Sequence, residues 1–93
     1  MLNEIDDLDL LPFTKAYLDY NSPIKAYMLF KNHMWMTAIV LSSGDTTKKS
    51  ISLRKWKFNK TKDSWIATSN FIMNNKQQVA DTIQVLNNFY DEM

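Results

Sequence analysis

Through the middle of the chain, hydrophobic residues recur at every second position, which predicts β-strands because successive side chains of a strand point to opposite faces. Residues 25–31 and 34–42 are the first two predicted strands, and only Asn32 and His33 separate them, which is the spacing of a hairpin. Residues 34–42 are apolar on both faces, which indicates a strand in the centre of a sheet. The only glycine of the chain lies in the next predicted turn, 43–47.

Two further strands are predicted at 48–58 and 64–73, on either side of a lysine-rich turn. Alternation divides the first of them into an apolar face, which we expect in the core, and a more polar face, which we expect to be exposed. The apolar face carries Ile51 and Leu53, and the other face carries Ser52, Arg54 and Trp56.

A helix is predicted to end the chain, because the period changes from two to that of a helix after residue 73. Asn74, with Gln77 three residues later, has the spacing of a capping box. Val79, Ile83 and Leu86 then form an apolar stripe, so we expect the helix to cover one face of the sheet.

Residues 1–23 are predicted to be a separate acidic arm, and residues 24–93 the main domain. Residues 2–11 show no dominant period and predict either a short helix or an irregular arm. Residues 13–20 carry aromatic residues at helical spacing, which predicts about two turns of helix, ended by a turn at 21–23. The expected fold class is α+β: a four-stranded antiparallel sheet followed by a C-terminal helix, after a short N-terminal helical or irregular arm.

Composition limits the class of protein. The chain has 93 residues, enough for one domain, and it has no cysteine, which excludes disulfides and thiolate metal sites. No apolar run reaches the length of a membrane span, and no N-terminal signal pattern is visible. We therefore expect a soluble, intracellular (cytoplasmic) protein without membrane contact.

The net charge of +1 conceals a strongly basic middle section. Residues 1–20 have a net charge of −4, residues 21–65 carry nine cations against two acids, and residues 66–93 have a net charge of −2. A basic block of this kind attracts polyanions locally. Around it, cations alternate with flat rings, and single-stranded nucleic acid needs both, because cations hold phosphates and rings stack on bases. The predicted nucleic-acid-binding residues are Arg54, Lys55, Trp56, Lys57, Lys60 and Lys62, with Lys48 and Lys49.

Each of these assignments has a structural alternative. Trp56 could pack against Trp35 across strands or lie in a dimer interface instead of stacking on a base. The lysines could form a solvated face that only protects a sheet edge and keeps the protein in solution. His33, the only histidine, lies in a predicted turn, and the acidic residues near the N-terminus lack the glycine-centred loop of a calcium site. We therefore expect no catalytic site, no metal and no cofactor.

The segment 51–56, Ile-Ser-Leu-Arg-Lys-Trp, and the segment that begins at Trp65 resemble the single-stranded-DNA-binding domain of the transcriptional coactivator family called positive cofactor four. That family has an aliphatic-x-aliphatic-Arg-x-aromatic motif, a loop, and then Trp-x-Pro-Thr-basic-basic-Gly-Ile before a helix. The resemblance covers roughly residues 24–90. Three positions depart from the pattern: the proline is Ala67, the glycine is Phe71, and the basic pair is Ser69-Asn70.

The resemblance implies a homodimer in which the helices pair and the curved sheets hold single-stranded DNA, without catalysis. It implies a sequence-tolerant role in transcription regulation, DNA replication or recombination, and the small size would suit a phage protein. RNA in place of DNA stays open. Because the basic pair is lost, a protein-interaction module that docks on a host polymerase or nuclease is the alternative. A second hypothesis has acidic residues 4–9 folding over the basic face and competing with DNA; the alternative is a disordered or packing arm.

Overall fold

The computed structural model describes residues 3–44 and 48–93, which form an α+β fold with one antiparallel sheet of five strands in the order β1-β2-β3-β4-β5. The predicted antiparallel sheet with a C-terminal helix is therefore confirmed, although the sheet has one more strand than expected. In chain order the elements are β1 (Asn3–Glu4), the 3-10 helix η1 (Leu8–Leu10), α1 (Lys15–Tyr20), β2 (Asn21–Lys31), β3 (Trp35–Gly44), β4 (Lys49–Asn59), β5 (Ser64–Met73) and α2 (Lys76–Glu92).

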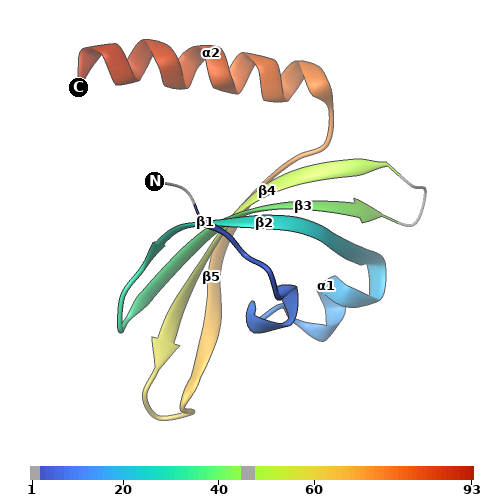
Figure 1. The fold of residues 1–93 in the computed structure, drawn as a ribbon, viewed down its shortest axis with the longest axis vertical. Coiled ribbons are helices and arrows are strands. Elements are labelled where there is room, and N and C mark those ends of the chain that lie inside the picture. The colour runs from blue at the N-terminus through green and yellow to red at the C-terminus, as the bar shows by residue number, and fades with distance from the viewer. Residues whose placement is uncertain (1–2, 45–47) are drawn as a thin grey trace.

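Each strand pairs with the next one in the chain, so the sheet is an antiparallel meander. The strands twist past one another at a narrow waist and splay apart on both sides of it (Figure 1). β3 is the central strand, as its two apolar faces predict. The extra strand, β1, has only two residues, which pair with Met28 and Tyr27 of β2. A pair of residues shows no measurable period, so the sequence pattern could not reveal it.

The N-terminal helix is shorter than predicted, and the turn expected after it is absent. Thr14 caps α1, because its side-chain oxygen accepts a hydrogen bond from the Tyr17 N–H at 3.2 Å. Asn21 is already extended, with φ −138° and ψ 145°, and it begins β2 directly. Pro23 lies within β2 where that strand pairs with β3 on one side, and β1 reaches only Tyr27 and Met28 on the other. A proline is tolerated there because it lies beyond the two residues that pair with β1.

One face of the sheet holds the core, and we call it the covered face. Its residues alternate along β3 and β4, and residues 3–20, which we call the N-terminal segment, lie over them. The buried apolar core consists of Leu11, Ala26, Met36, Ala38, Val40 and Trp56, with Ile5, Leu8, Phe13, Met28 and Trp65 packed against it. Trp56 is 2% exposed and Ser52 is 1% exposed. The prediction that the face with Ser52, Arg54 and Trp56 is exposed is therefore wrong, because the N-terminal segment supplies the apolar cover that this face needs.

The opposite face, which we call the open face, has the residues predicted for the core. The register places Trp35, Thr37, Ile39 and Leu41 of β3 opposite Lys57, Lys55, Leu53 and Ile51 of β4. In β5, Phe71 lies opposite Leu53 and is 49% exposed. Among the described residues, only the beginning of α2 borders this face: Val79 lines a hollow of about 270 Å³ together with Leu41, Ile51 and Met73.

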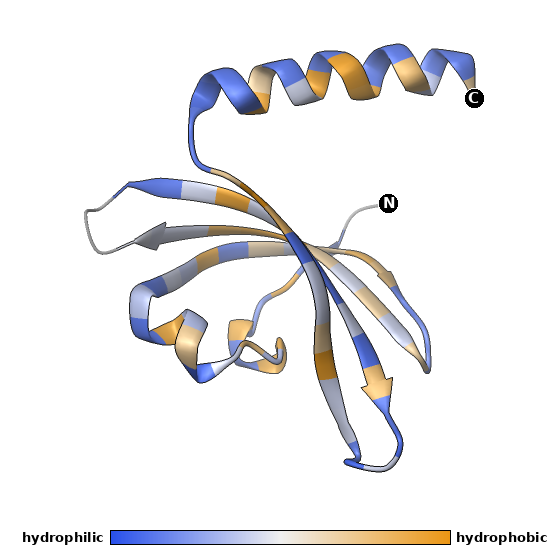
Figure 2. Ribbon diagram, turned by 180° about the vertical axis from the view of Figure 1, so that it is seen from behind, coloured by the Kyte–Doolittle hydropathy of each residue, from blue (hydrophilic) through white to orange (hydrophobic). Residues whose placement is uncertain are grey.

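After β5 the chain turns back, and α2 runs past the sheet as a separate element (Figure 1). It begins one residue later than predicted, because Asn75 and not Asn74 caps it by accepting a hydrogen bond from the Gln78 N–H at 2.7 Å. None of its residues is buried, and Leu86 is 57% exposed. The expectation that this helix covers a face of the sheet is thus wrong within a single chain. Apolar and polar residues alternate along its length (Figure 2). Within 3–44 and 48–93, no helix has the length and hydropathy needed to cross a bilayer.

Candidate nucleic-acid interface

Two lysines and a tryptophan form a cluster on the open face. Lys55 Nζ lies 4.5 Å from the centroid of the Trp35 ring, and Lys57 Nζ lies 5.3 Å from it. Both lysines are exposed, and Trp35 is partly exposed. We call these three residues the open cluster. Two cations beside an accessible ring provide what a single strand requires, namely charge for phosphates and a flat surface for a base.

The pairing of β3 with β4 brings the open cluster together. Trp35 is directly opposite Lys57, and Thr37 is directly opposite Lys55, so both lysines point to the same face as the tryptophan. A register shift in β5 lies next to Lys55, whose carbonyl accepts a hydrogen bond from Thr68 Oγ1 at 3.1 Å. Bulges of this kind bend a strand locally and commonly redirect side chains near functional sites.

A second ring lies near the open cluster. Phe30 of β2 is opposite Thr37 of β3, follows another register shift, and is 52% exposed. Phe30, Thr37 and Lys55 therefore lie in one row across three strands, with Thr37 between the ring and the cation. An exposed aromatic side chain beside cations extends the surface on which unpaired bases can stack.

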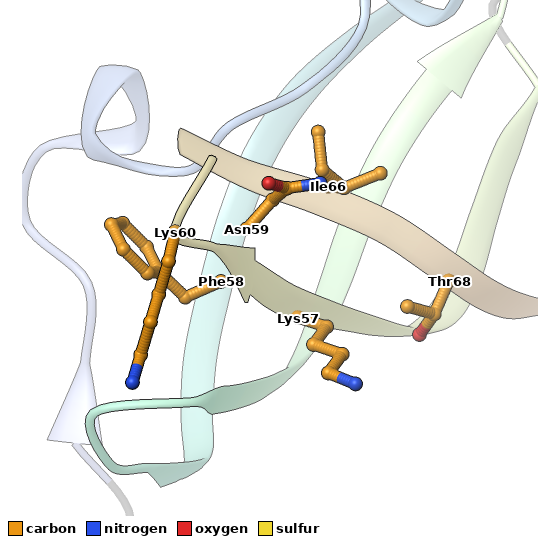
Figure 3. A pocket seen from close by; sticks show the side chains of 6 residues that line it. All are labelled: Lys57, Phe58, Asn59, Lys60, Ile66 and Thr68. Atoms are coloured by element: carbon orange, nitrogen blue, oxygen red, sulfur yellow. The ribbon is translucent and has the colours of Figure 1, made fainter. Parts of the chain in front are cut away.

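Beside the open cluster, the end of the β4–β5 hairpin encloses a hollow of about 360 Å³. Lys57 and Lys60 line this hollow together with Ile66 and Thr68 of the neighbouring strand, and Figure 3 shows the four side chains. The turn is stabilised by Asn59, whose side chain accepts a hydrogen bond from the Lys62 N–H at 3.0 Å. The hairpin therefore places two more predicted cations, Lys60 and Lys62, beyond the end of β4.

The remaining predicted lysines lie elsewhere. Lys48 and Lys49 are exposed at the opposite end of β4 from Lys60 and Lys62. β4 has 11 residues, so about 30 Å of strand separates the two ends. The structure therefore brings together Lys55, Lys57 and Lys60, and leaves Lys48 and Lys49 outside this group.

Arg54 and Trp56 form a different cluster on the covered face, together with two rings from the N-terminal segment; we call these four residues the covered cluster. Arg54 Cζ lies 4.1 Å from the centroid of Tyr17 and 5.8 Å from that of Phe13. Phe13 stacks on Tyr17 at 4.7 Å and meets Trp56 edge-on at 6.1 Å. Trp56 is buried against Phe13, so in this conformation its ring is not accessible to a base.

Arg54 has little polar compensation for its burial. Its Nε donates a hydrogen bond to Ser52 Oγ at 2.9 Å, and within the described ranges the ion pair observed is Glu4 with Lys25, not a pair with Arg54. Burial lowers the pKa of Arg54 from its ordinary value, and the neighbouring Tyr17 partly opposes this effect. The guanidinium therefore retains donors that an anionic ligand could use.

Trp35 is the site residue that the sequence interpretation missed. A signal for it was present: a hairpin centred near residue 46 places Trp35 opposite Lys57, and alternation then gives both the same face. Phe30 could not be found in this way, because a register shift between Met28 and Phe30 breaks the alternation.

The acidic residues do not lie over the open cluster in the part of the chain that the structure describes. Asp7 caps η1 by accepting a hydrogen bond from the Asp9 N–H at 3.0 Å, and Glu4 pairs with Lys25 at 3.5 Å. His33 is exposed in the β2–β3 turn. In residues 3–44 and 48–93, no group of three or more histidine, aspartate or glutamate side chains is arranged to hold a metal ion.

No protein-family model, curated protein or solved structure matches this chain. The assignment of function therefore depends on the geometry of the two clusters and on the motif resemblance.

Proposed function

We propose that this protein binds single-stranded nucleic acid, without marked sequence preference, through the open cluster and the neighbouring end of the β4–β5 hairpin. The observation that carries the proposal is the pair of lysine ammonium groups, Lys55 and Lys57, beside the accessible ring of Trp35. A base takes the face of the ring, and the lysines turn to the flanking phosphates.

The free energies of the contacts favour the replacement of the lysines by a base on the Trp35 ring. A cation beside a ring at an exposed site contributes about 0.5–1 kcal/mol. Stacking of a base on an aromatic side chain contributes about 1–3 kcal/mol, and each phosphate contact adds to it by releasing counterions. Because Lys55 and Lys57 are exposed, they can leave the ring at small cost.

The test is a fluorescence-anisotropy titration of labelled oligo-dT and oligo-U at about 50 and about 200 mM salt, with duplex DNA as competitor. The double variant Lys55→Ala/Lys57→Ala should bind about tenfold more weakly and flatten the log–log salt slope by about 1.4, which is 0.7 for each lost contact. The matched control, Lys15→Ala/Lys76→Ala, removes two exposed lysines from α1 and α2. Equal losses in both variants would assign the effect to overall charge and not to the open cluster.

We further propose that the binding unit is a homodimer. The helix α2 has 17 residues, none of them buried, and helices of this length are marginal without tertiary packing. The same chain also leaves the apolar half of the open face without a cover, and a second copy can cover both surfaces in a closed twofold arrangement. The exposed apolar residues in question are Phe71 of β5 and Ile83, Val85, Leu86 and Phe89 of α2.

Sedimentation velocity tests the homodimer. Leu86→Asp should convert a dimer to a monomer, because it places a charge within the apolar stripe of α2. Asn87→Asp is the control, since it introduces the same charge at the neighbouring, exposed position of the same turn. A monomeric wild type, or a dimer that persists in Leu86→Asp, would contradict this part of the proposal.

The alternative function, a protein-interaction module, is supported by the same uncovered apolar residues. It predicts that the wild type binds neither oligo-dT nor oligo-U at low salt. The titration therefore separates the two functions directly.

A further inference from the structure

The two edges of the sheet differ in how they are protected from pairing with another chain. At the β2 edge, β1 pairs with Tyr27 and Met28, and the same strand carries Pro23, Lys25 and Lys31. Prolines, lysines and covering segments are the usual means by which an edge strand avoids pairing with a foreign strand. The β2 edge is therefore protected along much of its length.

The opposite edge, β5, lacks these features. Its ten residues, Ser64–Met73, include no charged residue and no proline. Within 3–44 and 48–93, β4 is the one strand that pairs with β5, so every second N–H and C=O group of β5 points outward without a strand partner. Residues 66–72 are all exposed. A long, uncharged edge of this kind is a template for a further strand.

A register shift divides β5 into two parts. Thr68 lies between Ala67 and Ser69, which both pair with β4, but it has no direct partner of its own. A bulge twists an edge strand locally and hinders the pairing of a further strand at that point. Residues 69–73, by contrast, pair with β4 in regular register and lead into α2. This second part of β5 is therefore the regular, unprotected portion of the edge.

A second copy of this chain is the partner that fits residues 69–73. Because β5 carries no charge, its pairing with another β5 meets no like-charge repulsion. Two identical strands pair antiparallel about a twofold axis, and twofold dimers are the commonest soluble oligomers. Two residues separate β5 from α2, so the same axis also brings together two α2 helices, on which Ile83 and Leu86 are exposed.

We propose that β5 of one protomer pairs antiparallel with β5 of its partner through residues 69–73, which joins two five-stranded sheets into one. This inference rests on the proposed homodimer and specifies where the two copies meet. Because the twofold axis between two antiparallel strands is perpendicular to the sheet, the open faces of both protomers lie on the same side. The joined sheet then presents two open clusters on one surface, so one oligonucleotide of sufficient length can contact both.

Substitution at the edge tests the pairing by sedimentation velocity. Ile72→Lys places on β5 the residue that natural edge strands use against pairing, so the dimer should be lost. Leu18→Lys is the matched control, because it makes the same change in α1 at a side chain that is equally exposed, 49% in both cases. This control should remain a dimer. A dimer that persists in Ile72→Lys as in the wild type would contradict the pairing through β5.

Amide hydrogen exchange of the wild type, followed by NMR at the concentration used for sedimentation, tests the pairing without a substitution. At a free edge, every second amide points to solvent and exchanges fast. In the paired dimer, successive amides of residues 69–73 should all exchange as slowly as those of β4. Fast exchange at alternate residues of a dimeric protein would overturn the pairing and leave the homodimer standing. A monomeric wild type would overturn both and leave the edge to a strand of another protein.

Discussion

The covered and open clusters lie on opposite faces of the sheet. The covered cluster combines a tryptophan with one cation, and the open cluster combines a tryptophan with two. In the covered cluster, Trp56 is 2% exposed and lies within the core, whereas in the open cluster Trp35 remains partly accessible beside Lys55 and Lys57. The difference comes from the N-terminal segment, which contributes Leu11 and Phe13 to one face only. The same residue types thus serve stability on one face and are available to a ligand on the other.

The largest expected contrast between the faces is in stability. Trp56→Ala should lower the free energy of unfolding by about 3–5 kcal/mol, because it removes a large ring from a packed core and leaves a cavity. Trp35→Ala should lower it by about 1 kcal/mol, a typical value for a point substitution outside the core. Urea denaturation followed by circular dichroism measures both. Similar losses of stability in the two variants would show that Trp56 and Trp35 contribute equally to the core.

The second contrast is in binding. Trp35→Ala should weaken the binding of oligo-dT by about 1–3 kcal/mol, the loss of one stacked base. Trp65→Ala is the matched control in the same titration, since Trp65 packs against the core and meets Phe58 edge-on at 5.4 Å. A loss in Trp65→Ala as large as that in Trp35→Ala would place the stacking surface at the hairpin end and not at the open cluster.

The smallest expected effect on stability concerns the ion pair that helps to attach the N-terminal segment to the sheet. Glu4→Gln removes the ion pair with Lys25, in which both side chains are about half exposed. Exposed pairs contribute little, so the free energy of unfolding should change by less than about 0.5 kcal/mol. Thermal unfolding at low and high salt checks this value. A larger, salt-dependent loss of stability would mean that the ion pair, and not the apolar contacts of Leu11 and Phe13, holds the N-terminal segment on the sheet.

Periodicity predicted the sheet well, because local alternation is enough to identify long strands. It identified β3 as central from its two apolar faces, and it located the β2–β3 turn at Asn32 and His33. It missed β1, because a strand of two residues has no period. It also placed α2 against the sheet, although the contacts that bury an amphipathic helix depend on tertiary and quaternary packing.

The choice between the two faces of β4 could not be made from that strand alone. Ser52 and Arg54 are polar and suggested exposure, but Ser52 and Trp56 are buried. Arg54 lies over the ring of Tyr17, which is about 40 residues away in the sequence. Only the placement of the N-terminal segment decides which face is covered. By contrast, the open cluster could have been predicted from the hairpin register, which pairs Trp35 with Lys57.

The most direct test of the central claim is photo-cross-linking of the wild type to an oligo-dT strand that contains 5-iododeoxyuridine, followed by mass spectrometry of the peptides. The iodinated base reacts with the ring on which it stacks, so the adduct reports which tryptophan contacts the strand. The open cluster predicts that the principal adduct is on Trp35. Adducts on Trp56 or Trp65 with none on Trp35 would contradict binding at the open face.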